Sequence, residues 1–312
     1  MTPPPPPSEA IVAVVGPTAT GKSLLAVALA EAFQGEVVNA DPQQFYRGMD
    51  IGTAKLTPDE RRGIPHHQVD SLDVTEEASA ARYQREARRD VDAILDRGRR
   101  PIVVGGSGLY LRALLDCLDI PPTDPALRAR LEARARDEGP EALHAELERL
   151  DPSAAERISP ANGRRVVRAL EVVTLTGSFS ASLPERRYRR PTVQIGLRAE
   201  TDLLDGRIDE RSRRMWEGGL LEETRGLLRA GLRDGRTASK AIGYSEAIRC
   251  IDGEMGEREA VESTALRTRR LARRQARWFA PDPRIAWIGL DPSGDGDRVV
   301  TEALRILDTV DP

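Results

Sequence analysis

A glycine-rich segment near the start of the chain has the spacing of a phosphate-binding loop. The sequence GPTATGKS at residues 16–23 fits G-x-x-x-x-G-K-[ST] and follows a short apolar run. Its glycines let backbone N–H groups curl around an anion, and the start of the next helix adds its positive dipole end. Lys22 supplies a compact charge for the outer phosphate, and Ser23 supplies a hydroxyl for Mg²⁺. We therefore predict that a di- or triphosphate binds Gly16, Pro17, Thr18, Ala19, Thr20, Gly21, Lys22 and Ser23.

Asp41 is the second residue that could do chemistry. It follows the apolar run at residues 36–39, and open α/β sheets place their chemistry at the carboxyl ends of strands. A carboxylate there could ligate Mg²⁺ or act as a general base, and a plain turn cap before Pro42 is the structural alternative. Two uses of the phosphate loop stay open at this point. Kinases move a phosphoryl group, whereas other enzymes could hold a pyrophosphate leaving group while carbon chemistry takes place.

The elements that must position these residues alternate along the first 120 residues. Apolar runs typical of buried parallel strands alternate with segments of helical periodicity. The expected strands are 10–15, 36–39 and 101–104, and the expected helices are 22–33, 78–97 and 109–118. This alternation predicts an α/β fold, a P-loop NTPase-like parallel sheet flanked by helices.

Two prolines at 121–122 open a segment of a different kind. Residues 124–183 show helical periodicity without a convincing strand. Strand character returns at 192–197, helices fill 203–277, and a last strand is expected at 285–290. We therefore predict a first part of the core at 1–120, a helical insertion domain at 121–190, and a second part of the core with basic C-terminal helices at 191–312. The proline run at 3–7 predicts an extended tail.

Composition excludes several classes of protein. The 312 residues have a formal net charge of −3, and no apolar run approaches the roughly 20 residues of a membrane helix. The first residues lack the pattern of a signal peptide, and two cysteines cannot form a disulfide scaffold. We expect a cytoplasmic protein without a membrane partner.

Among 47 basic residues only Lys22, Lys55 and Lys240 are lysines, which indicates codon bias and suggests that arginine does not suffice at these three positions.

Several segments, in order along nearly the whole chain, resemble the tRNA dimethylallyltransferases, also called tRNA isopentenyltransferases or isopentenylpyrophosphate transferases. The matching segments are GPTATGKS at 16–23, DPQQFYRGMDIGTAK at 41–55, GIPHHQVD at 63–70, GGSGLY at 105–110, RIDERSRRM at 207–215, EGGLLEET at 217–224, KAIGYSEA at 240–247 and TRRLARRQARWF at 268–279. The resemblance implies a transferase that moves a dimethylallyl group from dimethylallyl diphosphate to N6 of adenine 37 in tRNAs. Pyrophosphate is released, and Mg²⁺ is the implied cofactor.

The resemblance also implies that the helical insertion at 121–190 binds tRNA, and it implies roles for single residues. Asp41 matches the catalytic base. Ser107 stands where the family usually has Thr and would contact the pyrophosphate and the adenine, although it could also be a helix N-cap. Arg211 would meet the pyrophosphate, with Arg207 one helical turn earlier as its competitor. Pro42 replaces the family's usual Ser and lacks its hydroxyl. The sequence does not explain why Gly108, a flexible residue, stands in the first turn of a helix.

An RNA-binding surface is expected from local charge. Residues 264–279 contain six arginines and no acid, and such patches contact phosphates, although ordinary surface charge is the alternative. Target bases are most accessible in single-stranded loops such as the anticodon loop. By resemblance, the residues that face tRNA are Asp41, Pro42, Gln43, Gln44, Ser107, Arg128, Arg164, Arg165, Val166, Val167, Arg168, Lys240, Ala241, Ile242, Gly243, Tyr244 and Ser245.

Other candidate residues are given structural roles. His66 and His67 lack a third ligand at usable spacing, His144 is expected at the surface, and Cys117 and Cys250 are expected to be packed thiols. Three rival functions remain. They are an adenylate isopentenyltransferase that acts on free nucleotide, a small-molecule kinase, and a non-catalytic RNA-binding protein with a relic phosphate loop. We expect a monomer, and the tRNA set, the donor preference and the order of substrate binding stay open.

Overall fold

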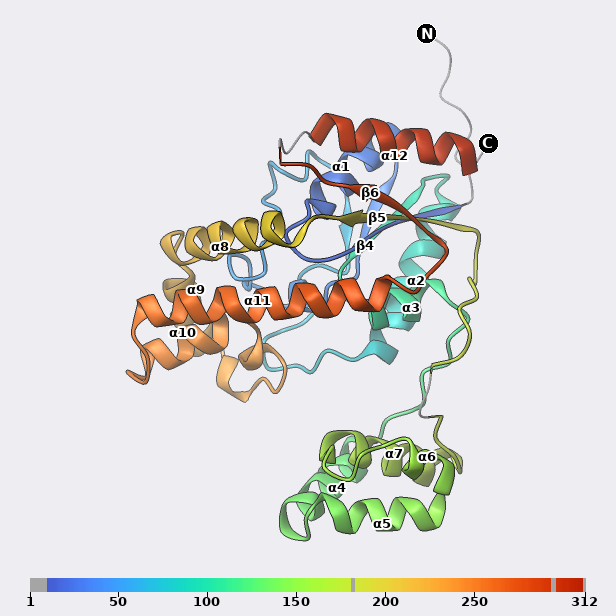
Figure 1. The fold of residues 1–312 in the computed structure, drawn as a ribbon, viewed down its shortest axis with the longest axis vertical. Helices are drawn as coiled ribbons and strands as arrows, with labels where there is room; N and C mark the ends of the chain where they lie inside the picture. Colours follow the sequence, from blue (N-terminus) through green and yellow to red (C-terminus); the bar gives the residue numbers. More distant parts are fainter. Residues whose placement is uncertain (1–9, 181–182, 293–295, 311–312) are drawn as a thin grey trace. The chain divides into compact units, whose positions relative to one another are not determined.

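The chain folds into two compact units (Figure 1). The computed structural model describes residues 10–180, 183–292 and 296–310. One unit joins Met1–Asp116 to Tyr188–Pro312, and the other is Cys117–Arg187. The second unit thus begins and ends slightly earlier than the insertion expected at 121–190. The proline run at 3–7 lies outside the described residues.

A parallel sheet forms the centre of the first unit. Its six strands lie in the order β3 (His66–His67), β2 (Glu36–Asn39), β4 (Pro101–Gly105), β1 (Ile11–Val15), β5 (Thr192–Arg198) and β6 (Ile285–Gly289), and all neighbours are parallel. Every residue of β1 is 2% exposed or less, because helices cover both faces of a parallel sheet. The predicted α/β class is confirmed. The two-residue strand β3 was not predicted, since it is too short to show a periodicity.

Helices cover the two faces of this sheet (Figure 1). On one face, α1 (Lys22–Ala32) and α12 (Gly296–Val310) bury Leu25, Leu29 and Leu307 against the strands. On the other, α2 (Ala80–Asp96) and α3 (Gly108–Leu115) bury Tyr83 and Leu111. Helix α12 was not predicted from the sequence, although its buried Val299, Ala303 and Leu307 recur at every fourth position, as expected for one face of a helix.

A group of helices lies between β5 and β6 in the chain. These are α8 (Thr201–Glu217), α9 (Leu220–Arg229), α10 (Tyr244–Ile251) and α11 (Glu257–Phe279). Helices α8 and α11 lie side by side (Figure 1) and share a small apolar cluster of Leu204, Ile208 and Ala272. The described part of this unit also contains the short 3₁₀ turns η1 (Pro42–Phe45), η2 (Leu232–Asp234) and η3 (Ala238–Lys240).

The second unit has its own core. It contains α4 (Pro125–Asp137), α5 (Pro140–Leu150), α6 (Pro152–Glu156) and α7 (Gly163–Thr176). Leu131, Leu143, Leu147 and Leu170 meet in a buried cluster. Across the residues that the structure describes in both units, no helix has the length and apolarity needed to cross a membrane.

Candidate active site

The phosphate loop connects the central strand β1 to the first turn of α1. Gly16 has a φ of 131°, and a side chain there would collide with the carbonyl oxygen of Leu197 on β5. Gly21, with a φ of 84°, is the N-cap of α1. Ala19 also has a positive φ, 65°, a conformation that costs energy for a residue with a side chain. The hydroxyl of Thr20 donates to the carbonyl oxygen of Pro17 at 2.8 Å. The loop thus has a defined, partly strained shape.

Lys22 is buried beneath this loop. Its Nζ donates to the carbonyl oxygen of Pro17 at 2.5 Å. Burial lowers the pKa of Lys22 to about 7; the charge of Asp41 raises this pKa and that of Arg211 lowers it. A buried ammonium without a full counter-charge is costly. An anionic ligand would supply that counter-charge.

Asp41 lies directly beyond β2 and caps η1. Its Oδ1 accepts from the backbone N–H of Gln43 at 3.0 Å, and its own N–H donates to Oδ1 of Asn39 at 3.0 Å. Burial raises the pKa of Asp41, against the opposing effects of the Gln43 N–H, Lys22 and Arg211. The turn cap proposed as an alternative therefore exists, and the same carboxylate also interacts electrostatically with two cations.

Arg211 reaches the phosphate loop from α8. Its Nη2 donates to Oγ1 of Thr18 at 2.8 Å. Burial lowers its pKa, and the charge of Asp41 opposes this effect. Within the described residues, no hydrogen bond or ion pair involves the side chain of Arg207, one turn earlier. Of the two arginines, the structure thus brings only Arg211 to the phosphate loop.

The segment from Gly105 to Gly108 meets the same site from the end of β4. A side chain at Gly105 would come within 2.9 Å of Ala40, the residue before Asp41, and one at Gly106 within 3.3 Å of the Gly16 carbonyl oxygen. The glycines therefore allow the segment to approach both loops closely. Ser107 is the N-cap of α3, but its side chain makes no capping hydrogen bond.

A steric reason explains why residue 108 is a glycine. A side chain at this position would overlap the indole ring of Trp278, on α11. Trp278 is 38% exposed. Neither Trp278 nor its neighbour Gln275 was singled out from the sequence. Gly108 was the signal in the sequence that could have indicated this contact, because a glycine within a helix can mark the close approach of another element.

The loop that follows η1 is held by Lys55. Its side chain is 3% exposed, and Nζ donates to the carbonyl oxygen of Tyr46 at 2.6 Å, to Asp50 at 2.7 Å and to Asp70 at 2.5 Å. An ammonium can direct three donors to three acceptors around one point, which a planar guanidinium cannot do. This geometry gives Lys55 a reason to be lysine. Lys240 is exposed, and nothing in the structure explains why it is lysine.

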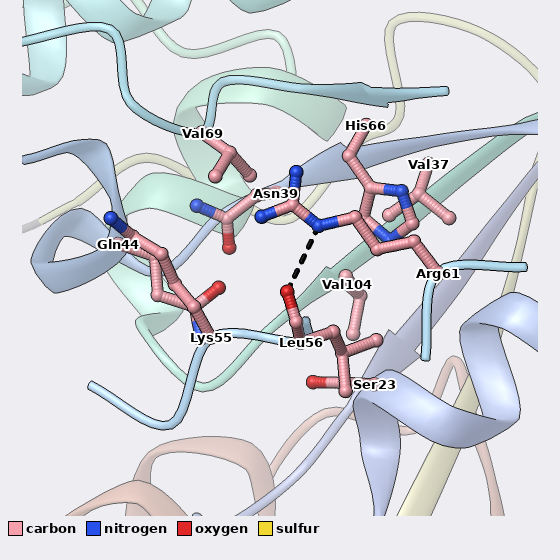
Figure 2. A pocket seen from close by; sticks show the side chains of 10 residues that line it. All are labelled: Ser23, Val37, Asn39, Gln44, Lys55, Leu56, Arg61, His66, Val69 and Val104. Carbon is pink, nitrogen blue, oxygen red and sulfur yellow. Dashed lines mark hydrogen bonds between the residues drawn. The ribbon is translucent and has the colours of Figure 1, made fainter. Parts of the chain in front are cut away.

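A small cavity lies between this loop and the phosphate loop. Its volume is about 20 Å³, and Ser23, Asn39, Gln44 and Lys55 are among its lining residues (Figure 2). Arg61 closes one side by donating from Nε to the carbonyl oxygen of Leu56 at 3.0 Å (Figure 2). A space of this size holds about one water molecule. Gln44 donates to the carbonyl oxygen of Thr53 at 3.1 Å, whereas the buried Oε1 of Gln43 has no partner in the described residues.

Comparison with known proteins agrees with this arrangement. A family model described as IPP transferase matches residues 44–282. The chain belongs to this family. A tRNA dimethylallyltransferase of Kineococcus radiotolerans is 55% identical over 309 residues, which cover 97% of this chain and 96% of the relative. One of Salinispora tropica is 57% identical, over 95% of this chain and 92% of the relative.

Solved structures give the same result for the fold. The tRNA isopentenylpyrophosphate transferase of Bacillus halodurans matches with a TM-score of 0.72 and 40% identity, over 96% of each chain. A eukaryotic dimethylallyltransferase described as acting on tRNA matches with a TM-score of 0.80 and 27% identity, over 97% of this chain and 80% of that one.

The stretch at 240–245, expected to face RNA in this IPP transferase, is largely buried. Ala241 is 5% exposed and Tyr244 is 0% exposed. The Tyr244 hydroxyl donates to Glu223 at 2.5 Å and accepts from the N–H of Gly52 at 3.2 Å. Gly243 has a φ of 91° at the N-cap of α10. The side chains of Ala241 and Tyr244 are therefore buried within the protein, and Lys240, Ile242 and Ser245 are the more exposed members.

The basic helix α11 contains arginines of two kinds. Arg267, Arg269 and Arg273 form ion pairs with Glu246, Asp209 and Asp205. Arg270, Arg274 and Arg277 are exposed, and they form no ion pair with the residues that the structure describes. Their spacing of four and three residues places them on one face of the helix. We call Arg270, Arg274 and Arg277 the open arginine face.

In the second unit, a buried carboxylate organises two of the expected RNA contacts. Glu171 is 0% exposed and accepts from Arg128 at 2.7 Å and from Arg168 at 2.7 Å. These arginines therefore have a structural partner. Val166 and Val167, also expected to face tRNA, are buried in the core of this unit. Arg164 and Arg165 are exposed on α7.

The histidines and cysteines have structural surroundings. His66 and His67 form β3, and His67 lies 2.7 Å from Glu36. His144 is half-buried rather than at the surface, with Nε2 at 2.8 Å from the carbonyl oxygen of Ile158. Cys117 is exposed and follows α3, so its expected packing is wrong. Cys250 is half-buried in α10, and burial raises the pKa of its thiol.

Proposed function

We propose that this protein transfers a dimethylallyl group from dimethylallyl diphosphate to N6 of adenine 37 in tRNA. The observation that supports this most strongly is the meeting of Lys22, Asp41 and Arg211 at the phosphate loop, where their charges act on one another. This set suits a reaction in which an anion departs and a proton is removed. The names of the relatives in the IPP transferase family point to the same reaction.

The proposed chemistry assigns each group a task. A bond forms between N6 and the allylic carbon, the carbon–oxygen bond to the diphosphate breaks, and its electron pair leaves with pyrophosphate. The N6 proton passes to Asp41. Lys22, Arg211 and the backbone N–H groups of the phosphate loop stabilise the charge that develops on the leaving group. The hydroxyl of Ser107, which makes no capping hydrogen bond to α3, would contact the pyrophosphate or the adenine.

Mg²⁺ fits this site as a proposed cofactor. Among the described residues, no group of three or more His, Cys, Asp or Glu could hold a metal ion. This suits Mg²⁺ at a phosphate loop, because it keeps several waters and takes substrate phosphate oxygens as ligands. Ser23, which lines the small cavity beside the loop, would hold the ion. When bound, the ion would neutralise charge on the departing pyrophosphate.

RNA would be held by exposed basic groups. The open arginine face on α11 would contact phosphates of an anticodon stem-loop. In the second unit, Arg164 and Arg165 on α7 would also contact RNA. Gln43 and Gln44 share η1 with the Asp41 cap and would contact the target base or its neighbours. We further propose that the enzyme is a monomer and works in the cytoplasm.

One assay tests this proposal against its rivals. An unmodified anticodon stem-loop is incubated with dimethylallyl diphosphate and Mg²⁺, and its mass is measured. We expect the mass gain of one dimethylallyl group at adenine 37, and a gain at least about a hundredfold slower with the Asp41→Asn variant. An unchanged RNA mass would refute the proposal. Modification of added AMP instead would favour the adenylate enzyme, and turnover of ATP would favour the kinase.

A further inference from the structure

Thr18, in the middle of the phosphate loop, is held from two helices at once. Arg211 on α8 donates to its hydroxyl at 2.8 Å. Gln275 on α11 accepts from its backbone N–H through Oε1, also at 2.8 Å. The two helices lie side by side (Figure 1). The phosphate loop is therefore tied to residues that follow it in the chain by about two hundred positions or more.

The surroundings of Gln275 are shaped to receive its side chain. A side chain at Gly106 would collide with Nε2 of Gln275, and one at Gly108 would collide with Trp278. Gln275 and Trp278 are three residues apart and so lie on neighbouring positions of one helix face. Two glycines of the segment 105–108 thus make room for two side chains of α11. This fit places the Gln275 amide between that segment and the phosphate loop.

We propose that Gln275 is a positioning residue that holds the phosphate loop in the shape that receives the diphosphate. The inference rests on the proposed function. Ala19, next to Thr18, has a φ of 65°, so the loop keeps a costly conformation that needs support from its surroundings. The hydrogen bond to the Thr18 N–H supplies such support. A neutral amide does so without the negative charge that a glutamate would bring near the diphosphate.

Kinetic measurements on Gln275→Met test the role. Methionine keeps the length of the side chain but removes the acceptor. We expect the KM for dimethylallyl diphosphate to rise about five- to tenfold, the range that one lost hydrogen bond corresponds to. The KM for the RNA stem-loop should change less than about twofold, since the lost bond is to the phosphate loop. Arg258→Met, on the same helix at a side chain 94% exposed, is the matched control and should behave as wild type.

Gln275→Glu tests the effect of charge separately from the hydrogen bond, because glutamate keeps the acceptor and adds a negative charge. The glutamate keeps an acceptor for the Thr18 N–H, so the midpoint of thermal unfolding should match that of wild type. Binding of inorganic pyrophosphate, followed by calorimetry without RNA, should nevertheless weaken because like charges repel. A variant Gln275→Met with wild-type pyrophosphate binding would overturn the proposal. Equal losses in the KM for RNA and for the diphosphate would also overturn it.

A double-mutant cycle gives an independent check. Gly106→Ala should push the Gln275 amide aside and weaken pyrophosphate binding in the wild-type background. In the Gln275→Ala background, the same substitution should have a smaller effect, because the obstructing amide is gone and the 3.3 Å approach to the Gly16 carbonyl oxygen remains. Additive losses would contradict the proposal. Since pyrophosphate binding is measured without turnover, an inactive wild type would refute the proposed function and leave the test of Gln275 intact.

Discussion

Lys22 and Asp41 perturb each other across the phosphate loop. Burial lowers the pKa of Lys22 to about 7, and the charge of Asp41 opposes this shift. Burial raises the pKa of Asp41, and the charge of Lys22 opposes that shift. Both groups are thus pushed toward their neutral forms before substrate binds. A diphosphate would stabilise the ammonium form of Lys22, so binding and protonation should be linked.

The pH dependence of diphosphate binding should report Lys22. Below pH 7 the ammonium is already present, so Lys22 should add no pH dependence to pyrophosphate binding in that range. As the pH rises above about 7, Lys22 loses its proton and binding must restore it, so the affinity should fall by up to about tenfold per pH unit. Calorimetry in buffers of different ionisation enthalpy should detect proton uptake. Lys22→Met should bind weakly without this pH dependence, and a pH-independent wild type would contradict the linkage.

Asp41→Asn should separate catalysis from binding. Turnover should fall by about 10²- to 10⁴-fold, the usual contribution of a general base, while pyrophosphate binding stays within a few-fold. In the wild type, kcat/KM should rise with pH as Asp41 loses its proton, with a midpoint above the usual carboxyl range because burial raises this pKa. Asp59→Asn, at an exposed aspartate of the following loop, is the control. Comparable losses of turnover and binding would argue against a base.

Substitution of Arg211 by lysine should lower kcat/KM for the diphosphate far more than the same substitution of Arg207. Arg211→Lys removes the forked guanidinium that reaches Thr18, and kcat/KM for the diphosphate should fall by about 10- to 100-fold. Arg207→Lys should stay within about twofold, since its side chain makes no ion pair or hydrogen bond in the described structure. Steady-state kinetics with varied diphosphate measures both variants. The reverse order of effects would transfer the assignment to Arg207.

Lys55→Arg should destabilise the fold. A guanidinium cannot donate hydrogen bonds to Tyr46, Asp50 and Asp70 from the position of Nζ. The free energy of unfolding should therefore fall by about 1–3 kcal/mol. Urea unfolding followed by circular dichroism measures this difference. Lys240→Arg, at an exposed position, serves as the control and should not change stability. A loss at Lys240 equal to that at Lys55 would mean that the hydrogen bonds of Lys55 are not the cause.

The open arginine face should determine the salt dependence of RNA binding. Arg270→Ala, Arg274→Ala and Arg277→Ala should each weaken binding and reduce the slope of log affinity against log salt by roughly 0.7–0.9. Arg273→Ala should have a smaller effect, because this arginine is paired with Asp205 at 2.7 Å. Binding of a labelled stem-loop at several salt concentrations measures the slopes. Identical slopes for all four variants and the wild type would exclude this face.

Local features were the ones that the sequence could predict. Strand β1 and the phosphate loop follow from an apolar run and two glycines, because both depend on neighbours in the chain. The position of Asp41 beyond β2 follows from the same pattern. Helix α12 was missed although its buried residues recur regularly. The burial of Tyr244 was missed because it depends on Glu223 and Gly52, which lie in separate segments.

Residue types and their order along the chain determined the fold class, the phosphate loop and the resemblance to the IPP transferase family. Tertiary structure alone decided which arginines are available. Arg128 is held by Glu171 and Arg273 by Asp205, whereas Arg274 is left exposed on the same helix as Arg273. It also placed Gln275 on the Thr18 N–H and explained Gly108 through Trp278. The reason is physical. Ion pairs and close packing depend on distances between segments far apart in the chain, which spacing along the sequence does not specify.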